Sequence, residues 1–376
     1  MLFSNVRYFG ADGHFHVGNV TVENGFITAV SETGCAAEKL LLPGLIDVHL
    51  HGNQGLDFSD GDISQYERMA RYLAKNGTTG FSATTMTLPP AVIENACRCA
   101  AAFKKAETKN AARLLGITME GPFFSAAKKG AQNEAYLLPP DAKLLHVLQE
   151  AAEGLLRIVC VAPELPGALQ FVSAATEAGF RVSLAHTAAD YDTAAAAFDA
   201  GACHLTHTFN AMPALMHRAP GVIGAAQERD HVTAELIGDG MHVHPSVMRA
   251  AFKLFPGRIC LVSDAIPPAG AKAGTYSLGE QPVTVKNGLA TLADGTIAGS
   301  TATLFGCLKN CIRFGIAEED AVVAAALTPA KALNVQHEYG VIALGYRADM
   351  LLCSLDYELE TVFLGGEAIE SNEKEF

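Results

Sequence analysis

The stretch Leu40-Leu-Leu-Pro-Gly-Leu-Ile-Asp-Val-His-Leu-His-Gly52 joins a run of apolar residues to two histidines separated by one residue. The apolar run is typical of a buried strand, and the glycine ends it. Side chains on a strand alternate between its faces, so His49 and His51 project to the same side, as two ligands of one cation must. An isolated His-x-His pair is more often a polar strand end that contacts only solvent or backbone. Other strand ends in the chain favour the metal site.

Short apolar runs recur along most of the chain and alternate with alanine-rich stretches of helical periodicity, such as 66–76, 91–105 and 191–200. This alternation predicts parallel βαβ units, and eight of them predict an α/β fold with a (β/α)8 TIM-like barrel. The expected barrel strands are 45–50, 79–84, 114–119, 156–161, 181–185, 204–206, 233–237 and 259–262.

The two ends of the chain differ from the middle. Residues 17–22 and 26–30 flank the turn residues Glu23-Asn24-Gly25 and predict a β-hairpin, and 349–354 and 360–364 have the same strand character. We expect both termini to form one small β-sandwich domain. The predicted division is 1–43 and 343–376 for the β-domain and 44–342 for the metal-dependent hydrolase barrel, with a β insertion around 276–295.

Composition excludes several classes of protein. The chain has 376 residues, 49% of them hydrophobic, which suits a barrel-sized domain with a small accessory one. Residues 1–10 lack the pattern of a signal peptide and no window holds eighteen apolar residues, so we expect a cytoplasmic protein without a membrane partner. Nine cysteines without a C-x-x-C pair indicate reduced thiols, including Cys307 and Cys311 in the core. A net charge of −13 disfavours nucleic-acid binding.

Polar residues stand at the ends of the predicted barrel strands, where reactive side chains of such barrels collect. Taken singly each has a structural explanation, because an acidic residue can cap the following helix and a histidine can be a hydrogen-bonded core residue. Together they predict a nitrogen and oxygen site suited to zinc, iron, manganese or cobalt. The residues are His49, His51, Glu120, His186, His207 and Asp264.

The acidic residues of this set have distinct expected roles. The chain has no lysine between Lys143 and Lys253, so a carboxylated lysine cannot come from the strand ends in that range. Glu120 is then the natural carboxylate ligand and could bridge two ions. Asp264 is the candidate general base, since a carboxylate beside a metal site can take a proton from the attacking water and later give it to a leaving nitrogen.

Longer segments extend this pattern. They are Pro43-Gly-Leu-Ile-Asp47, Glu120-Gly-Pro-Phe123, Lys129-Gly-Ala131, His186-Thr187, His207-Thr-Phe-Asn-Ala-Met212, Asp239-Gly-Met-His242, Ser263-Asp-Ala265 and Gly295-Thr-Ile-Ala-Gly-Ser300. With these segments the chain resembles, over nearly its whole length, the amidohydrolase superfamily and within it the N-acetylglucosamine-6-phosphate deacetylases. The His-x-His pair marks only the superfamily, whereas the segments 207–212 and 239–242 are much more specific to the deacetylases.

The resemblance implies one or two divalent metal ions per subunit, with zinc expected and iron, manganese or cobalt as alternatives. It implies that Glu120, His186 and His207 bind the main ion, that His49 and His51 are available for a second, and that Asp264 is the catalytic acid/base. The substrate-binding residues it implies are Ala131, Gln132, Asn210, Ala211, Arg218, His242, Ile297 and Ala298.

The resemblance also implies a homodimer in which Arg218 reaches into the neighbouring site to hold the sugar phosphate. Without the motifs beside it, Arg218 would be interpreted as a solvated loop charge. A phosphate, however, needs such donors in a protein this acidic.

Two departures from the family pattern matter. Some members replace the His-x-His pair with polar residues and use one metal, whereas His49 and His51 are intact here. Gln132 stands where many relatives carry a histidine near the acetyl group, and an amide can donate a hydrogen bond but cannot titrate near neutrality. The metal count and the preferred hexosamine are therefore left open.

The resulting hypothesis is metal-dependent hydrolysis of the acetamide of N-acetylglucosamine 6-phosphate to glucosamine 6-phosphate and acetate, in amino-sugar catabolism. One alternative is the same chemistry on another N-acetylhexosamine 6-phosphate, such as N-acetylgalactosamine 6-phosphate. A second is an amidohydrolase acting on a non-phosphorylated amide. A third, a non-catalytic scaffold, is disfavoured because every predicted ligand is present.

Overall fold

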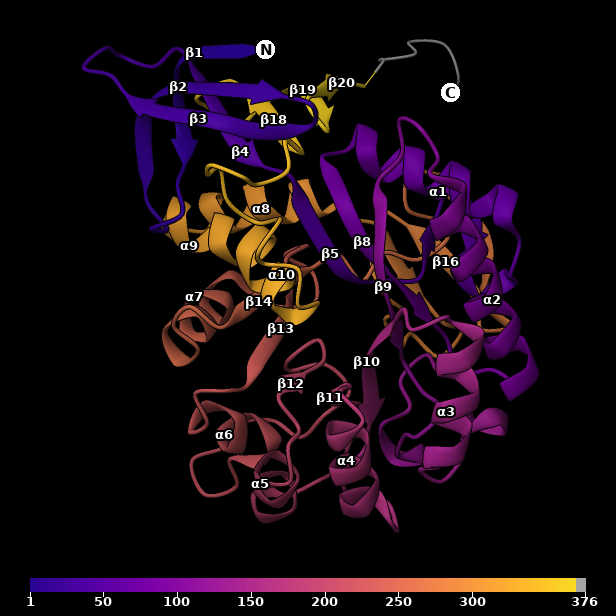
Figure 1. Ribbon diagram of the computed structural model, residues 1–376. Coiled ribbons are helices and arrows are strands. Elements are labelled where there is room, and N and C mark those ends of the chain that lie inside the picture. Colours follow the sequence, from indigo (N-terminus) through magenta and orange to yellow (C-terminus); the bar gives the residue numbers. More distant parts are fainter. Residues whose placement is uncertain (370–376) are drawn as a thin grey trace.

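The eight predicted apolar runs form eight neighbouring parallel strands in the computed structural model, which describes residues 1–369 (Figure 1). The strands follow one another round the sheet in chain order, so the predicted (β/α)8 barrel is confirmed. They are β5 (Leu45–Leu50), β8 (Thr78–Thr85), β9 (Arg113–Met119), β10 (Leu156–Val161), β11 (Arg181–Leu184), β12 (His204–Leu205), β13 (Thr233–Ile237) and β14 (Ile259–Val262).

The first and last strands of this sheet meet at the carboxyl ends of the strands. The backbone N–H of Asp264 donates to the carbonyl oxygen of His49 at 2.9 Å, and the N–H of His51 donates to the carbonyl oxygen of Ala265 at 2.7 Å. These bonds nearly close the barrel between β5 and the segment that follows β14.

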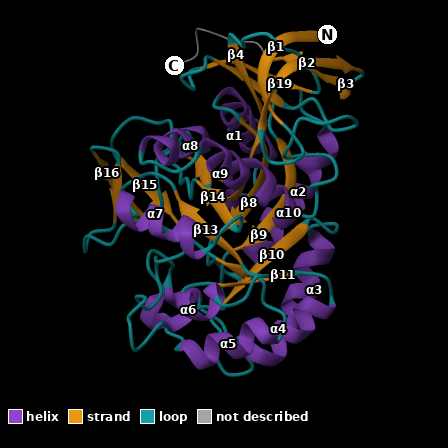
Figure 2. Cartoon of the chain, turned by 90° about the vertical axis from the view of Figure 1, so that its left-hand side faces the viewer, coloured by secondary structure: helices purple, strands orange, loops and turns teal. Residues whose placement is uncertain are grey.

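Helices surround the strands on the outside of the barrel (Figure 2). Several begin at an acidic or hydroxyl residue whose side chain accepts a hydrogen bond from a first-turn amide, as Asp62 does before α1 and Asp190 does before α5. The helices are α1 (Ile63–Lys75), α2 (Pro90–Ala106), α3 (Ala142–Ala151), α4 (Ala168–Glu177), α5 (Tyr191–Asp199), α6 (Gly221–Gln227), α7 (Pro245–Leu254), α8 (Leu304–Arg313), α9 (Glu318–Val322) and α10 (Thr328–Ala332).

Both ends of the chain form a second sheet at the top of Figure 1, where the indigo and yellow segments lie together. Its spatial order is β20-β19-β18-β4-β1-β2-β3, so β4 joins the N-terminal strands to the C-terminal ones. The strands are β1 (Leu2–Phe9), β2 (Phe15–Glu23), β3 (Phe26–Glu32), β4 (Lys39–Pro43), β18 (Met350–Cys353), β19 (Leu359–Leu364) and β20 (Glu367–Ala368).

This terminal sheet folds over on itself. The rings of Phe3 and Phe363, on strands that are not neighbours in the sheet, meet edge to face with centroids 5.0 Å apart. The N–H of Ile27 on β3 donates to the carbonyl oxygen of Tyr346, just before β18, at 2.8 Å. The predicted hairpin and the predicted small β-domain are thus confirmed, while the division at residues 43 and 343 stays a prediction and 370–376 lies outside the described residues.

Three short strands follow β14, where the insertion is predicted: β15 (Thr275–Leu278), β16 (Gln281–Lys286) and β17 (Leu289–Thr291). The insertion contacts the loop after β9, since Gln281 Nε2 donates to the carbonyl oxygen of Ala131 at 2.6 Å and the Tyr136 hydroxyl donates to Glu280 at 2.6 Å. A two-stranded ribbon, β6 (Gly52–Asn53) and β7 (Leu56–Asp57), follows the histidine pair.

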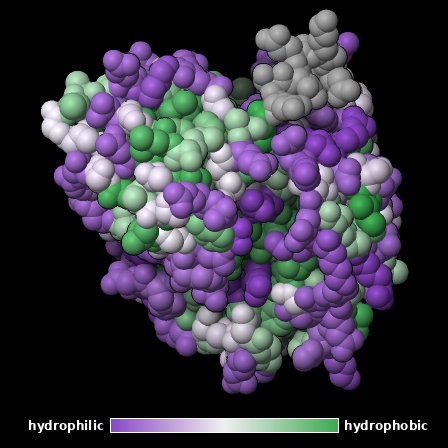
Figure 3. All heavy atoms as spheres, turned by 45° about the horizontal axis from the view of Figure 1, so that its top comes forward, coloured by the Kyte–Doolittle hydropathy of each residue, from purple (hydrophilic) through white to green (hydrophobic). Residues whose placement is uncertain are grey.

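The surface seen in Figure 3 is mainly hydrophilic, with small apolar patches between the polar side chains. No helix within residues 1–369 has both the length and the apolar character needed to cross a membrane. All nine cysteines are free thiols, and Cys307 and Cys311 are buried on α8, as predicted for core thiols.

Candidate metal centre and active site

The barrel places all six predicted polar strand-end residues at one mouth. Each is at most 7% exposed. Three of them, His186, His207 and Asp264, lie two residues beyond the ends of their strands and have positive φ angles of 43°, 29° and 50°. Side-chain sterics disfavour this region for residues other than glycine, and such strain is commonly found at functional sites. The backbone therefore turns sharply at the strand ends where these three side chains meet.

The Glu120 carboxylate lies at the centre of the cluster. Its two oxygens contact the Nε2 atoms of four imidazoles. Oε1 lies 3.0 Å from His207, 3.2 Å from His186 and 3.4 Å from His49, and Oε2 lies 3.1 Å from His51.

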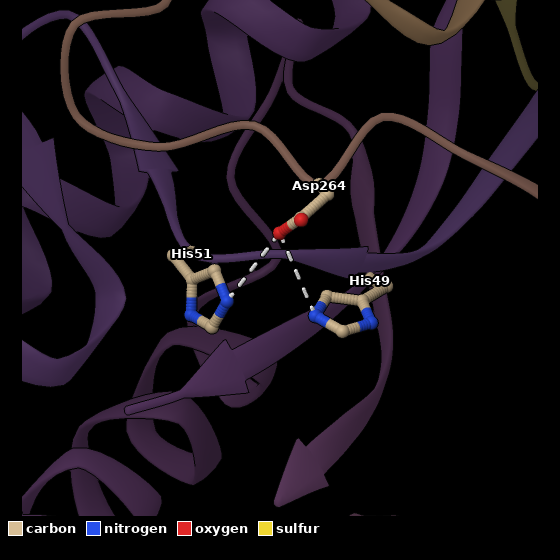
Figure 4. A group of neighbouring side chains, drawn as sticks. All are labelled: His49, His51 and Asp264. Carbon is tan, nitrogen blue, oxygen red and sulfur yellow. Dashed lines mark ion pairs between the residues drawn. The ribbon is translucent and has the colours of Figure 1, made fainter. Parts of the chain in front are cut away.

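Asp264 faces both histidines of the pair, as Figure 4 shows. Its Oδ1 atom is 3.7 Å from His49 Nε2 and 3.6 Å from His51 Nε2. The site therefore contains two compact groups of donor atoms, His49 with His51 and Asp264, and Glu120 with His186 and His207.

This donor set fits a divalent cation. The Nε2 atoms of His186 and His207 lie 3.2 Å apart, and two unprotonated nitrogens at that distance repel unless a cation or proton lies between them. The buried Nε2 atom of His49 has no hydrogen-bond partner among the described residues. Imidazole nitrogens and carboxylate oxygens are the ligands that zinc and related ions prefer.

The electrostatics of the cluster also favour a bound cation. Burial by itself would raise the pKa of Glu120, but His49 and the other imidazoles hold it well below its ordinary value. Burial would lower the pKa of His49, but Glu235 and Glu120 raise it well above the ordinary value. The same carboxylates that attract a proton to the imidazole would attract a metal ion.

Hydrogen bonds from the other ring nitrogen orient two of the imidazoles. His186 Nδ1 lies 2.9 Å from the carbonyl oxygen of Lys128, and His49 Nδ1 lies 2.9 Å from Glu235 Oε2. A proton on Nδ1 leaves the Nε2 lone pair facing the centre. Glu235 is not among the residues predicted from the sequence, although a charged residue in the middle of the apolar strand 233–237 is a signal of a functional role.

A pocket of about 310 Å³ opens above the cluster. Among the predicted substrate-binding residues, those that line it are Ala131, Gln132, Asn210, Ala211, His242 and Ile297. Ala298 is fully buried and does not line it, and Arg218 lies exposed outside it. Lining residues that the sequence did not single out include Met86, Lys128, Ile266 and Leu278.

The side chain of Gln132 is held at both ends. Its Oε1 accepts from the N–H of Thr87 at 2.8 Å, and its Nε2 donates to Glu120 Oε2 at 2.6 Å. The amide thus orients the central carboxylate from the side of the pocket.

His242 is paired with the carboxylate of Asp239, with Nδ1 and Oδ2 at 2.7 Å. Burial acts to lower the pKa of His242, but the hydrogen bond and the charge of Asp239 raise it above its ordinary value. A cationic imidazole in the pocket wall suits an anionic ligand.

A (β/α)8 barrel with histidine and carboxylate donors at its strand ends defines a class of hydrolases. The sequence profile described as Amidohydrolase family matches residues 40–369, and the chain belongs to this family.

Particular relatives are more informative. The chain is 37% identical to the N-acetylglucosamine-6-phosphate deacetylase of Vibrio furnissii, over 88% of this chain and 82% of the relative. It is 36% identical to that of Bacillus subtilis (strain 168), over 95% and 94%. It is also 32% identical to the N-acetylgalactosamine-6-phosphate deacetylase of Escherichia coli O157:H7, over 96% and 97%.

Solved structures agree over almost the whole fold. The N-acetylglucosamine-6-phosphate deacetylase of Thermotoga maritima superposes with a TM-score of 0.91 at 29% identity, covering 98% of this chain and 99% of that one. A mutant of the Mycobacterium smegmatis enzyme in complex with N-acetyl-D-glucosamine-6-phosphate gives a TM-score of 0.91 at 30% identity, with coverage of 98% and 99%.

Proposed function

We propose that this amidohydrolase is an N-acetylglucosamine-6-phosphate deacetylase, which hydrolyses the acetamide of its substrate to glucosamine 6-phosphate and acetate. The observation that carries the proposal is the Glu120 carboxylate facing four imidazole Nε2 atoms beside Asp264, on the floor of a pocket. The relatives that cover most of the chain, named for this reaction, support the substrate.

We assign Glu120, His186 and His207 to the main metal ion, and His49 and His51 to a second one where two are bound. Zinc is the proposed ion, because imidazole-rich sites suit it, and iron, manganese and cobalt are the alternatives. When bound, such an ion would polarise the amide carbonyl and lower the pKa of water at the site.

Asp264 is the proposed acid/base. In this role its carboxylate takes a proton from the water that attacks the carbonyl carbon, giving a tetrahedral intermediate. As the carbon–nitrogen bond breaks, Asp264 returns the proton to the departing nitrogen, so that the products are the amine and acetate. Asp264 lines the pocket, which puts its carboxylate within reach of a bound amide.

The pocket wall supplies the proposed contacts to the sugar phosphate. Asn210, Ala211, His242 and Ile297 line it together with Ala131 and Gln132, and the amide of Gln132 is bound to Glu120. In a chain with a net charge of −13, a phosphate must be held by such local groups.

Arg218 extends this proposal to a homodimer. It lies exposed on the segment 213–220, beside the exposed side chains of Leu215 and Met216. An arginine outside its own pocket could complete the phosphate site of a second copy, and the apolar neighbours would suit an interface. We propose that the dimer acts in the cytoplasm, in amino-sugar catabolism.

The epimeric substrate N-acetylgalactosamine 6-phosphate is the second candidate. Gln132 favours keeping it, because an amide bound to Glu120 stands where many relatives carry a titratable histidine near the acetyl group. A relative named for the galacto substrate covers nearly the whole chain as well.

The test is acetate release by purified, metal-supplemented protein from N-acetylglucosamine 6-phosphate, its galacto epimer and unphosphorylated N-acetylglucosamine. Preference for the first supports the proposal. Preference for the epimer would replace it with the second candidate, and activity without the phosphate would indicate an amidohydrolase of another substrate class. Protein that retained no stoichiometric metal when grown without chelators would favour a scaffold instead.

A further inference from the structure

Glu235 is a charged residue in the middle of β13 with no exposed surface. It shares a strand face with Ile237, which lines the pocket, but neither Glu235 nor His204 reaches the pocket itself. Its role is therefore not direct contact with a substrate.

Three donors satisfy the Glu235 carboxylate. Its Oε2 accepts from His49 Nδ1 at 2.9 Å and from the backbone N–H of His207 at 3.1 Å. Its Oε1 accepts from His204 Nε2 at 2.9 Å. A buried carboxylate is costly to desolvate, and an apolar side chain of similar size would serve stability at least as well. The arrangement thus indicates a function other than stability.

The contact with His49 determines which ring nitrogen faces the cluster. With its proton held on Nδ1, on the side away from Asp264 in Figure 4, the ring presents a bare Nε2 to Glu120 and Asp264. The other imidazoles of the described site differ. His186 Nδ1 contacts a backbone carbonyl, and the buried Nδ1 atoms of His51 and His207 have no hydrogen-bond partner in the described residues.

The same carboxylate oxygen also touches the second donor group. Oε2 accepts hydrogen bonds from both the ring of His49 and the backbone of His207. This one atom therefore links a residue of the first donor group to a residue of the second. Movement of Glu235 would turn the His49 ring and release the turn that carries His207.

We propose that Glu235 is a positioning residue that fixes the tautomer of His49 and its placement relative to His207, with His204 holding the remaining carboxylate oxygen. The inference rests on the metal site of the proposed function, but its readouts need no substrate.

Metal affinity is the first readout. Wild type, Glu235→Gln, His49→Gln and the double variant are equilibrated with chelator-buffered zinc, and bound zinc is measured by mass spectrometry. We expect Glu235→Gln to weaken zinc binding about 10- to 100-fold. The two losses should be less than multiplicative in the double variant, because much of the effect of Glu235 passes through the His49 ring. Wild-type affinity in Glu235→Gln, or losses that multiply in the double variant, would overturn the proposal.

Asp349→Asn is the matched control. Asp349 is a buried carboxylate that is hydrogen-bonded to Arg113 and to the backbone of Gly365, away from the metal ligands. This variant disturbs a buried hydrogen-bonded carboxylate without touching the site, so its zinc affinity should match wild type. Loss of zinc in Asp349→Asn to the same extent as in Glu235→Gln would attribute the effect to general destabilisation.

A second readout uses the zinc-loaded wild-type protein and stands even where Glu235→Gln does not fold. Nitrogen-15 spectra of histidine-labelled protein, with the His49 signal assigned by its absence in His49→Gln, report which ring nitrogen carries the proton. A proton on Nδ1, slow to exchange with water, supports the proposal, and a proton on Nε2 contradicts it. Protein that bound zinc but released no acetate would overturn the proposed function and leave this inference standing.

Discussion

The backbone N–H of Asp264 donates a hydrogen bond to the backbone carbonyl oxygen of His49, with an N···O distance of 2.9 Å. This bond joins the segment after β14 to β5 and thereby helps to close the barrel. It also brings the side chain of Asp264 beside the imidazole, with Oδ1 at 3.7 Å from Nε2. The hydrogen bond that helps to close the barrel therefore also places the proposed acid/base beside the histidine pair.

Replacement of Asp264 by Asn tests the acid/base. The amide keeps the shape of the side chain but cannot accept the proton. We expect kcat to fall about 100-fold or more, while the ion held by Glu120, His186 and His207 is retained. Stopped acetate assays and metal analysis of the same preparation measure both quantities. Near-normal turnover in the metal-loaded variant would remove Asp264 from this role.

Hybrid dimers test the placement of Arg218. Arg218→Ala should raise KM for the phosphorylated substrate about tenfold or more, because a charge-assisted hydrogen bond is lost. If the arginine serves the partner's site, mixing this variant with Asp264→Asn after subunit exchange creates dimers with one complete site. At substrate concentrations below KM, roughly a quarter of wild-type activity should return. Activity equal to the sum of the separate variants would show that each subunit uses its own arginine.

The Asp239–His242 pair predicts a pH dependence. Because Asp239 raises the pKa of His242 above its ordinary value of 6.5, the imidazolium and its attraction for phosphate persist above that pH. They are lost as the pH rises through the raised pKa, so KM for the phosphorylated substrate should increase there. In Asp239→Asn the amide donates to Nδ1 and favours the neutral ring, which moves this increase to lower pH.

The measurement is KM against pH between about 6 and 8.5, around the ordinary pKa of histidine. The kcat at saturating substrate serves as the control, since Asp264 is unchanged. Superimposable profiles for wild type and Asp239→Asn would contradict a role for the charge on His242.

The Arg113–Asp349 pair predicts how the terminal sheet is fastened to the barrel. Arg113 Nε donates to Asp349 Oδ2 at 2.8 Å, and the N–H of Gly365 donates to Oδ1 at 2.6 Å. Asp349→Ala leaves a partly buried guanidinium without its partner, so we expect unfolding to become easier by about 2 to 3 kcal/mol. Urea unfolding followed by circular dichroism measures the change.

The control for that measurement is an exposed pair in the same sheet. Lys39→Met removes the contact of Lys39 with Glu360, and solvent-exposed pairs contribute about 0 to 1 kcal/mol. Equal effects of the two substitutions would mean that the buried pair does not fasten the sheet.

Local sequence was enough to predict the barrel strands and the polar residues at their ends. The apolar runs that predicted barrel strands are the observed strands within a residue or two, because burial on both faces leaves a continuous hydrophobic signal. The histidines and acidic residues that end those runs lie at one mouth because all barrel strands are parallel. Chain order and residue type therefore predicted which residues form the site and at which end of the barrel they lie.

Only the tertiary structure decided which of these groups touch and what holds them. Glu235 and His49 are 186 residues apart, and Gln132 is bound to Glu120 rather than free in the pocket. Likewise, Arg218 stands outside the pocket that its neighbours line, although the sequence places it a few residues from Asn210. Periodicity reports which side of a strand or helix is buried, but a hydrogen bond between distant segments depends on barrel closure and side-chain packing, which leave no local pattern.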